Sequence, residues 1–292
     1  MSPHTVRAYR QDLEQLRDFL VVKLKRSDNP CEITLADMRM WVASMVSDGL
    51  KTCSVVRKIQ SARRFFHYLQ RYHGLPCNPA AELQAPAVEK RLPDCIREEE
   101  INATVDSFEF DETSFVYVRD SLIVSMLYTT GMRSAELIGL KNSAVDTVRG
   151  ELKVLGKRNK ERIIPFGDEL KEMITRYRTL RTSLLDTLGQ ADASDDAFFI
   201  RPTGEPLYYG LLYRTVRREL DGAGVHASRR SPHILRHSFA TDMLNNGADL
   251  SALQQLLGHA SLASTQKYTH LTYRDLKTNY ELAHPRAQKK ED

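Results

Sequence analysis

A segment rich in proline and charge, APAVEKRLPDC at residues 85–95, divides the chain into two parts. It has no apolar periodicity, which is typical of an interdomain linker rather than of a helix or strand. The chain has 292 residues and is 41% hydrophobic, enough for two modest hydrophobic cores. We therefore expect an N-terminal domain over 1–86, a linker over 87–95 and a C-terminal domain over 96–292.

The part before the linker has the periodicity of helices only. Apolar residues recur every three or four positions over 3–23, which predicts an amphipathic helix. A second helix is expected at about 35–47 with Thr34 as a possible N-cap, and a third at about 54–72. A short helix is expected at 79–84. This domain is predicted to be all helical.

The part after the linker is mostly helical with one strand-like patch. Leu152–Leu155 and Arg162–Phe166, joined by the polar loop GKRNKE, predict a β-hairpin. Helical patterns are found at about 97–106, 115–130, 134–140, 168–188, 208–222, 232–246, 249–257 and 274–283. The missing βαβ alternation and glycine-rich phosphate loop argue against ATP or nicotinamide chemistry. The predicted fold class is mainly α, with a mixed α+β second domain that is mostly helical around a small β-hairpin or sheet.

The net charge of +4 permits a polyanionic partner without requiring one. Residues 1–86 hold 13 Lys and Arg against 8 Asp and Glu, whereas 87–292 hold 29 against 30. The basic excess of the first part suits phosphate contacts, but a solvated helical surface explains it equally well. Basic side chains gather on one side of the helix expected at 54–72, among them Arg57, Lys58, Arg63 and Arg64.

The four cysteines, Cys31, Cys53, Cys77 and Cys95, are not spaced as CxxC pairs. This spacing argues against a disulfide scaffold and a zinc site. No apolar run approaches the ~20 residues of a membrane span, and the first residues lack the apolar core of a signal peptide. We expect a cytoplasmic protein with no membrane partner.

Arg133 lies in the segment TTGMRSAEL. Gly131 can end one helix in the left-handed conformation and Ser134 can cap the next, which places Arg133 at a helix-to-helix corner. Glu136 could brace a nearby cation. An ordinary surface Arg–Glu pair explains this motif alone at least as well.

The segment SPHILRH predicts a helix that starts with Ser231 as N-cap and Pro232 in its first position. His233 then falls in the first turn, where free N–H groups attract anions, and Arg236 lies on the same face. A phosphate pocket and a capped surface helix remain equally open. His233 and His237 have the spacing of zinc helices, but no Glu follows His233 as in HExxH, so metal binding is not expected.

Two further motifs complete the set. Lys157 lies in the hairpin loop with Arg158 and Lys160, where the alternatives are a DNA contact and a solvated turn. In LLGHASLASTQKYTH, His259 follows a glycine that can end a helix, and Tyr268 lies nine residues further on. A helix-turn-helix, with Tyr268 as a recognition or packing residue, is the other interpretation of this segment.

Taken together, the motifs TGMRSAEL, GKRNKER, HILRH, LLGH and KYTH resemble those of the tyrosine recombinase (phage integrase) family. The resemblance is strongest to the bacterial Xer members of the XerC and XerD type. It extends over the whole chain, because SPHTVRAYRQDL and SARRFFHYL are similar to the family's N-terminal domain. The hairpin has GKRN where the family usually has GKGN.

The resemblance implies six catalytic residues: Arg133, Lys157, His233, Arg236, His259 and Tyr268. The two arginines would clamp the scissile phosphate, with Glu136 as a supporting residue and a hydrogen bond from the second histidine. The tyrosine would attack and leave a 3′-phosphotyrosyl link, with His233 as base and Lys157 as general acid. The link conserves the bond energy, so neither a metal nor another cofactor is implied.

The resemblance also implies a C-clamp on double-stranded DNA, with a SAM-like core-binding domain on one face and the catalytic domain on the other. The DNA-binding residues would then be Arg57, Lys58, Arg63, Arg64, Arg158 and Lys160. Strand exchange would need four protomers, as a homo- or heterotetramer with a second recombinase, and a translocase as possible regulator. Residues 274–287 are expected to dock on a neighbouring protomer through Leu276, Tyr280 and Leu282, with packing in cis as the alternative.

Three functions remain. The first is a Xer-type site-specific recombinase that resolves chromosome dimers, with roles in chromosome partition and cell division. The second is an integrase or transposase of a mobile element with the same chemistry. The third is a helix-turn-helix regulator that binds DNA without cutting it. The compact length favours the first, and the set of six residues speaks against the third.

Overall fold

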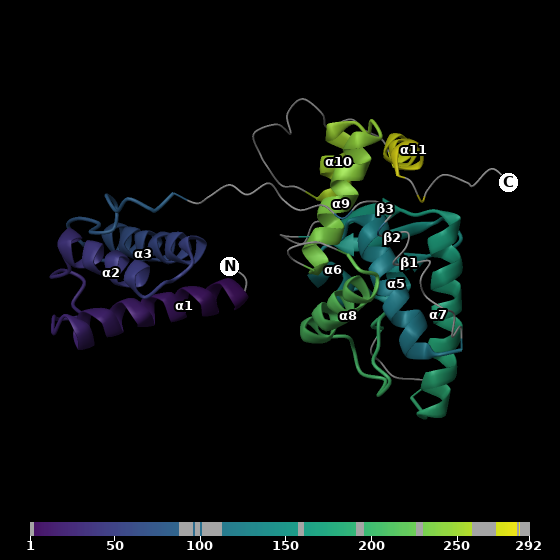
Figure 1. Cartoon of the computed structure of the whole chain (residues 1–292), viewed down its shortest axis with the longest axis horizontal. Helices are drawn as coiled ribbons and strands as arrows, with labels where there is room; N and C mark the ends of the chain where they lie inside the picture. The colour runs from purple at the N-terminus through teal and green to yellow at the C-terminus, as the bar shows by residue number, and fades with distance from the viewer. Residues whose placement is uncertain are drawn as a thin grey trace. The chain divides into compact units, whose positions relative to one another are not determined.

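The computed structural model describes residues 3–87, 96, 100, 113–156, 161–190, 196–225, 230–258, 273–284 and 286. The chain divides into two compact units, Met1–Leu92 and Pro93–Asp292, each with a hydrophobic core of its own (Figure 1). The division falls inside the segment 87–95 that we interpreted as a linker. In these ranges, no helix has both the length and the apolar character needed to cross a bilayer.

The described part of the N-terminal unit is helical. Its elements are α1 (Pro3–Asp18), the π-helical turn η1 (Phe19–Lys23), α2 (Leu35–Ser47) and α3 (Thr52–Tyr72). Thr34 caps α2 as predicted: its hydroxyl accepts from the Asp37 N–H, and the Asp37 carboxylate accepts from the Thr34 N–H at 2.9 Å. Trp41 of α2, the only tryptophan of the chain, is 3% exposed in the core between these helices.

The prediction of a short helix at 79–84 is wrong, because residues 79–82 form turns. The guanidinium of Arg63, on α3, donates to the carbonyls of Ala80 and Leu83. The Asn78 side chain accepts from the Ala80 N–H at 2.9 Å and donates to the Arg63 carbonyl. These side-chain bonds satisfy backbone groups that a helix would pair internally.

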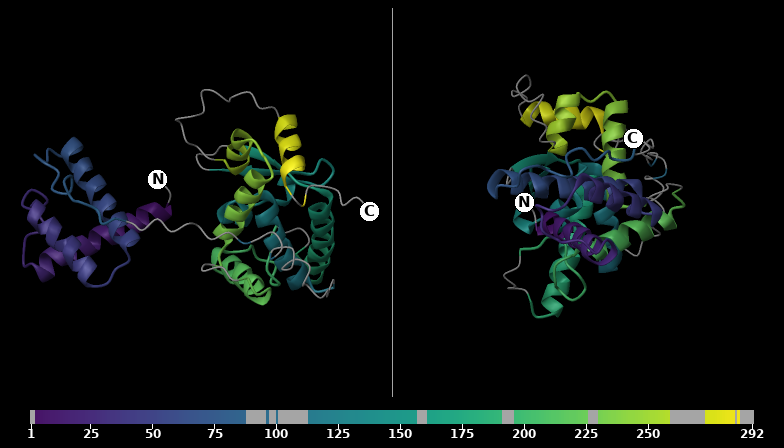
Figure 2. Two further views of the ribbon diagram at one scale, coloured as in Figure 1. Left: turned by 45° about the horizontal axis from the view of Figure 1, so that its top comes forward. Right: turned by 90° about the vertical axis from the view of Figure 1, so that its left-hand side faces the viewer.

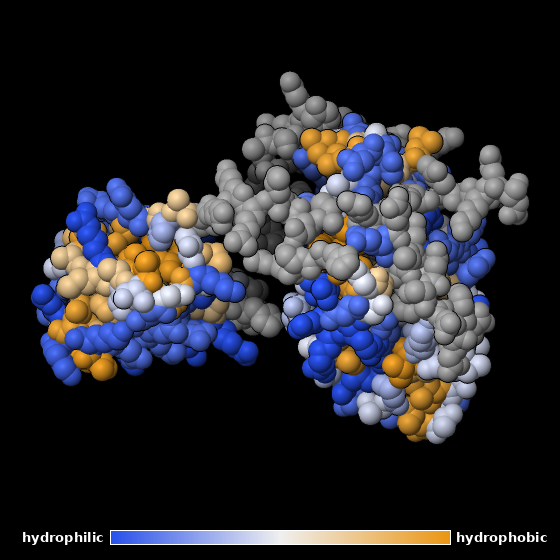
Figure 3. Space-filling view, in the orientation of Figure 1, coloured by the Kyte–Doolittle hydropathy of each residue, from blue (hydrophilic) through white to orange (hydrophobic). Residues whose placement is uncertain are grey.

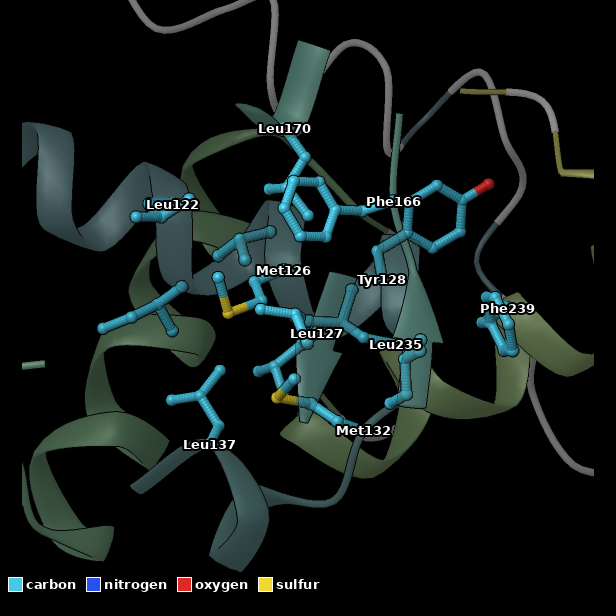
Figure 4. Close-up of a cluster of buried hydrophobic side chains, with 14 of the residues drawn as sticks. Leu122, Met126, Leu127, Tyr128, Met132, Leu137, Phe166, Leu170, Leu235 and Phe239 are labelled. Carbon is cyan, nitrogen blue, oxygen red and sulfur yellow. The ribbon is translucent and has the colours of Figure 1, made fainter. Parts of the chain in front are cut away.

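The C-terminal unit is built around one buried helix. Its helices are α5 (Phe115–Thr130), α6 (Ser134–Ile138), the 3₁₀ turn η2 (Asn142–Ala144), α7 (Asp168–Thr187), α8 (Tyr209–Gly222), α9 (Pro232–Asn245), α10 (Leu250–Leu257) and α11 (Tyr273–Ala283). Helix α5 is buried on all sides from Val118 onward and packs against α7, α8 and α9 (Figure 1). Met132 and Leu137, from the corner that follows α5, point into the same cluster as Leu127 and Leu235 (Figure 4).

The predicted hairpin is present and carries an additional strand. Strands β1 (Val145–Asp146), β2 (Glu151–Leu155) and β3 (Glu161–Pro165) form an antiparallel sheet in the order β1-β2-β3. The sequence did not indicate β1, because two residues are too short for an alternating pattern to stand out. The fold class is as expected, mainly helical with a small sheet in the second domain.

Helix α11 packs on its own domain, against α9, α10 and β3, and it lies beside α10 in the views of Figures 1 and 2. Tyr280 is 1% exposed and His284 is fully buried. The two rings stack with their centroids 5.1 Å apart, and the His284 ring lies 5.4 Å from that of Phe239 on α9. Of the three expected anchors, Tyr280 is thus buried in cis, whereas Leu276 is half-buried and Leu282 is 70% exposed.

Candidate active site

The corner between α5 and α6 holds Arg133. Gly131 ends α5 in the left-handed conformation, with φ of 58°, as predicted, and a Cβ at this position would overlap the Phe239 ring. Ser134 does not cap α6, contrary to expectation, because Arg133 occupies the N-cap position and Ser134 is buried in the first turn. Instead, the Glu136 carboxylate accepts from the Arg133 backbone N–H at 2.7 Å. The same carboxylate therefore shapes the corner and contacts the arginine.

Helix α9 starts at Pro232 as predicted, but the side chain of Ser231, in the N-cap position, makes no capping bond. His233 is exposed in the first turn. Arg236 lies one turn further on, and its guanidinium donates to the carbonyls of Gly131 at 2.6 Å and Leu257 at 2.7 Å. Arg236 therefore ties α9 to the ends of both α5 and α10.

The C-terminus of α10 is the point where three arginines converge. Three consecutive carbonyls at this end, those of residues 256–258, each accept from a different guanidinium. The pairs are Arg162 Nε to Leu256 O at 2.7 Å, Arg236 to Leu257 O at 2.7 Å, and Arg133 to Gly258 O at 2.9 Å. Such carbonyls have no partner within their own helix, and the helix dipole makes this end partly negative. The α10 terminus thus serves as a cation-binding platform.

Among the residues that the structure describes, Glu136 is the one carboxylate bonded to two of these arginines. It accepts from Arg133 at 2.8 Å and from both terminal nitrogens of Arg162, each at 2.8 Å. Burial alone would raise the pKa of Glu136, but the bonds from Arg162 and from the backbone and side chain of Arg133 outweigh it and lower the pKa to about 2. Glu136 is therefore ionised at neutral pH.

The cluster keeps an excess of positive charge, with three guanidinium groups around one carboxylate. Burial, and then repulsion from Arg133, lower the pKa of Arg236 to about 10 despite the attraction of Glu136. Arg236 still carries its charge near pH 7. The Arg133 side chain is 34% exposed, so solvent and ligands can reach it. Partly desolvated, crowded cations of this kind are stabilised by a bound anion, and a planar guanidinium fork fits phosphate oxygens.

Five predicted site residues lie outside the described part of the chain: Lys157, Arg158, Lys160, His259 and Tyr268. Their roles remain predictions. The structure brings Arg133, Arg236 and Glu136 together, with His233 one turn before Arg236. In the described ranges, no group of three or more His, Cys, Asp and Glu side chains is arranged to hold a metal.

Comparison with known proteins shows the family of the chain. Residues 95–275 match the phage integrase family, and residues 1–73 match the phage integrase N-terminal SAM-like domain. The chain belongs to the phage integrase family of tyrosine recombinases. It is therefore an enzyme that cleaves and rejoins DNA, and the alternative of a regulator that binds DNA without cutting it was wrong.

Full-length relatives of this recombinase include Xer proteins. It is 36% identical to the tyrosine recombinase XerC of Alcanivorax borkumensis, over 100% of this chain and 91% of the relative. It is 34% identical to the tyrosine recombinase XerD of Proteus mirabilis, over 98% and 88%. Among solved structures, XerA recombinase is 29% identical with a TM-score of 0.51, over 98% of this chain and 94% of that chain. The XerH site-specific recombinase bound to its difH substrate shares the fold, with 23% identity and a TM-score of 0.68 over 94% of this chain and 78% of that chain.

The basic residues predicted on α3 of the recombinase have different environments. Lys58 is 5% exposed and donates to the Asp12 carboxylate at 3.1 Å. The Arg63 guanidinium is bonded to backbone carbonyls of its own unit. The burial of Lys58 corrects its expected role as a phosphate contact, whereas Arg63 is only partly buried and its contact with DNA stays a prediction. Arg57 and Arg64 are exposed, so for them DNA contact remains a prediction.

Sequence reasoning missed Arg162 altogether, treating it only as the start of a strand. The available signal was the alternation of Arg162, Ile164 and Phe166, which places all three on one face of the strand predicted at 162–166. Because Ile164 is fully buried, an arginine on the same face needs partners inside the protein.

Proposed function

We propose that this recombinase holds the scissile phosphate of a DNA recombination site between Arg133 and Arg236, and that Tyr268 attacks it. The observation that carries the proposal is the attachment of both guanidinium groups to adjacent carbonyls at the end of α10, those of Leu257 and of the C-cap residue Gly258. Attack on a phosphodiester builds negative charge on the non-bridging oxygens, and donors fixed in advance stabilise that charge. His233, exposed at the N-terminus of α9, adds a third group on the side of Arg236.

The chemistry is a transesterification. The Tyr268 oxygen forms a bond to phosphorus while the bond to the 5′ oxygen breaks, which leaves a 3′-phosphotyrosyl link and a 5′ hydroxyl. His233 accepts the tyrosine proton, which a free phenol with a pKa near 10 releases poorly. Lys157 supplies a proton to the departing oxygen, and His259 donates a hydrogen bond to the phosphate. A 5′ hydroxyl from a partner strand then reverses the step.

The substrate we propose is a chromosomal site of the Xer type, with resolution of chromosome dimers as the biological role. Support comes from curated XerC and XerD relatives at about one-third identity over nearly the whole chain. Exchange between two duplexes requires four active sites, so we propose a tetramer on DNA, either of this chain alone or with a second recombinase. The alternative is integration of a mobile element, and covalent capture of genomic DNA distinguishes the two roles.

Contact between protomers through the C-terminal helix is part of this proposal. Hydrophobic surface gathers at the α10–α11 end of the C-terminal unit (Figure 3), where Leu250 and Leu282 are 58% and 70% exposed. Because Tyr280 is buried in cis, a neighbour would be contacted through the outer face of α11. Leu282→Asp should weaken cooperative assembly on DNA with two sites and leave single-site binding intact. Unchanged cooperativity would remove this face from the assembly.

Covalent capture tests the proposed function. The full-length protein is incubated with genomic fragments from its source organism and stopped with detergent, and the protein-linked DNA is recovered and sequenced. Wild-type protein should enrich one chromosomal sequence, whereas Tyr268→Phe should capture none but still bind the recovered sequence. Capture by Tyr268→Phe would refute the nucleophile. Enrichment of the ends of a mobile element would replace chromosome-dimer resolution by integration.

A further inference from the structure

Arg162 belongs to the core face of the sheet. It pairs with Val154 across β2 and β3, and its neighbour Ile164 pairs with Leu152. These three apolar neighbours are at most 2% exposed, and the Arg162 side chain itself is 12% exposed. A charge in such a place is stable only with several well-placed partners.

The partners of Arg162 come from two other elements. Its Nε donates to the Leu256 carbonyl of α10 at 2.7 Å, and its two terminal nitrogens donate to the two Glu136 oxygens of α6, each at 2.8 Å. The guanidinium also lies against Gly258, where an added Cβ would be 3.1 Å from Arg162 Nη1. One side chain thus joins β3, α6 and the end of α10.

We propose that Arg162 is a positioning residue for cleavage, which holds Glu136 and the α10 terminus so that Arg133 faces the phosphate. This inference rests on the proposed function of Arg133. Each of the three guanidinium nitrogens of Arg162 already donates to a protein oxygen, and its exposure is about a third of that of Arg133. Arg162 therefore acts through its neighbours rather than on the DNA.

The mechanism is competition for one carboxylate. Each Glu136 oxygen accepts one bond from Arg162 and one from Arg133, whose backbone N–H and guanidinium bind different oxygens. Without Arg162, the carboxylate is free to rotate and to pair with the Arg133 guanidinium through both oxygens. That geometry would draw Arg133 away from the phosphate. A misplacement of about 1 Å can slow an enzyme by about 10²-fold.

The test measures single-turnover cleavage of a nicked recombination site recovered by covalent capture, together with the DNA dissociation constant and the melting temperature. Arg162→Gln should slow cleavage by about 10²-fold and leave DNA affinity within about threefold. Arg162→Lys keeps the charge but cannot make the bidentate bond, so it should be slowed by about tenfold. Lys153→Gln is the matched control, because it removes an exposed cation of β2 that pairs with Glu161 and should cleave at the wild-type rate.

A cycle with Arg133→Ala separates the outcomes. If Arg162 works through Arg133, the double variant should cleave no more slowly than Arg133→Ala alone. If the rate losses of the two substitutions multiply in the double variant, Arg162 contacts the DNA separately and the inference is overturned. It is also overturned if cleavage is lost only in proportion to the loss of folded protein. Should Arg162→Gln fail to fold, Arg162→Lys carries the same comparison. Wild-type cleavage by Arg133→Ala would instead refute the proposed function.

Discussion

The two units of the molecule both bury basic side chains, but the partners neutralise the positive charge to different extents. In the N-terminal unit, Asp12 is 1% exposed and accepts from Lys58 at 3.1 Å and from Arg57 at 2.5 Å. The Gln15 side chain also accepts from Lys58, whose ammonium is thus satisfied inside the unit. In the catalytic unit, three arginines share the carboxylate of Glu136 and the end of α10, and part of their charge still faces solvent.

This difference separates cations that stabilise the fold from cations available to a ligand. A buried ion pair holds its place when every donor is satisfied, and breaking it costs stability. In a crowded, partly exposed cluster of arginines the positive charge exceeds the negative charge, so a bound anion stabilises it. Substitutions in the first cluster should therefore change the free energy of unfolding, and substitutions in the second should change the rate of cleavage.

The largest expected effect is on the first cluster. Asp12→Ala leaves Lys58 buried without its carboxylate and should lower the free energy of unfolding of the N-terminal unit by about 3–5 kcal/mol. Trp41, the only tryptophan, reports this unit alone by fluorescence during denaturant unfolding. Arg57→Ala is the matched control, because it removes the exposed partner and should cost at most about 1 kcal/mol. Equal effects of the two substitutions would contradict the distinction.

Arg236→Ala should change the rate of cleavage more than the stability of the protein. We expect a cleavage rate lower by about 10²–10³-fold, equivalent to ~2.7–4 kcal/mol of transition-state stabilisation, with little change in DNA affinity. The loss of stability should be smaller than that of Asp12→Ala, because only the bonds to the Gly131 and Leu257 carbonyls are lost. Single-turnover cleavage and equilibrium binding to the same duplex give both quantities. A parallel loss of binding and cleavage would make Arg236 a docking contact.

A smaller effect concerns pH. Burial, and then the nearby charge of Arg286, lower the pKa of His284 to about 3 despite a hydrogen bond to the backbone of Tyr128, so the folded state keeps this imidazole neutral. The unfolded chain binds the proton below about pH 6.5. The neutral His284 therefore makes its full contribution to stability above that pH. This contribution is lost as the pH falls toward 3, and the free energy of unfolding drops by at most about 1.4 kcal/mol per pH unit.

This slope is measured best between pH 6.5 and 5, where Glu136 does not yet titrate in either state. His284→Phe removes the titrating group, so its free energy of unfolding should fall less steeply over this interval than that of the wild type. Denaturant unfolding followed by circular dichroism compares the two slopes. Identical slopes would show that His284 is not held neutral in the folded protein.

The smallest effect tests the exposed side of the N-terminal unit. Arg64 is exposed and donates to the Tyr9 hydroxyl at 2.7 Å, so its charge is not neutralised by a carboxylate there. If it contacts a phosphate, Arg64→Ala should reduce the slope of log affinity against log salt by about 1, with the same change for all DNA sequences. An unchanged slope would place Arg64 away from the DNA.

Much of this could be predicted from the sequence, since local signals determine local structure. The left-handed turn at Gly131, the cap at Thr34 and the proline at the start of α9 each depend on a few adjacent residues. The partners of Arg162, Lys58 and Arg63 could not be predicted in this way. They lie far away in the sequence, and only packing brings Leu256 to Arg162 or Asp12 to Lys58. Lys58 was predicted on a basic face of α3 and is instead buried beside Asp12, a partner that the local pattern does not indicate.

The central claim is that Tyr268 forms the covalent link to DNA, and peptide mapping of the wild-type adduct tests it most directly. After nuclease and trypsin digestion, the nucleotide should lie on the peptide YTHLTYR, residues 268–274, which contains two tyrosines. Fragmentation by mass spectrometry distinguishes Tyr268 from Tyr273. We predict that the phosphate is on Tyr268. A phosphate on Tyr273, or on a peptide outside 268–274, would contradict it.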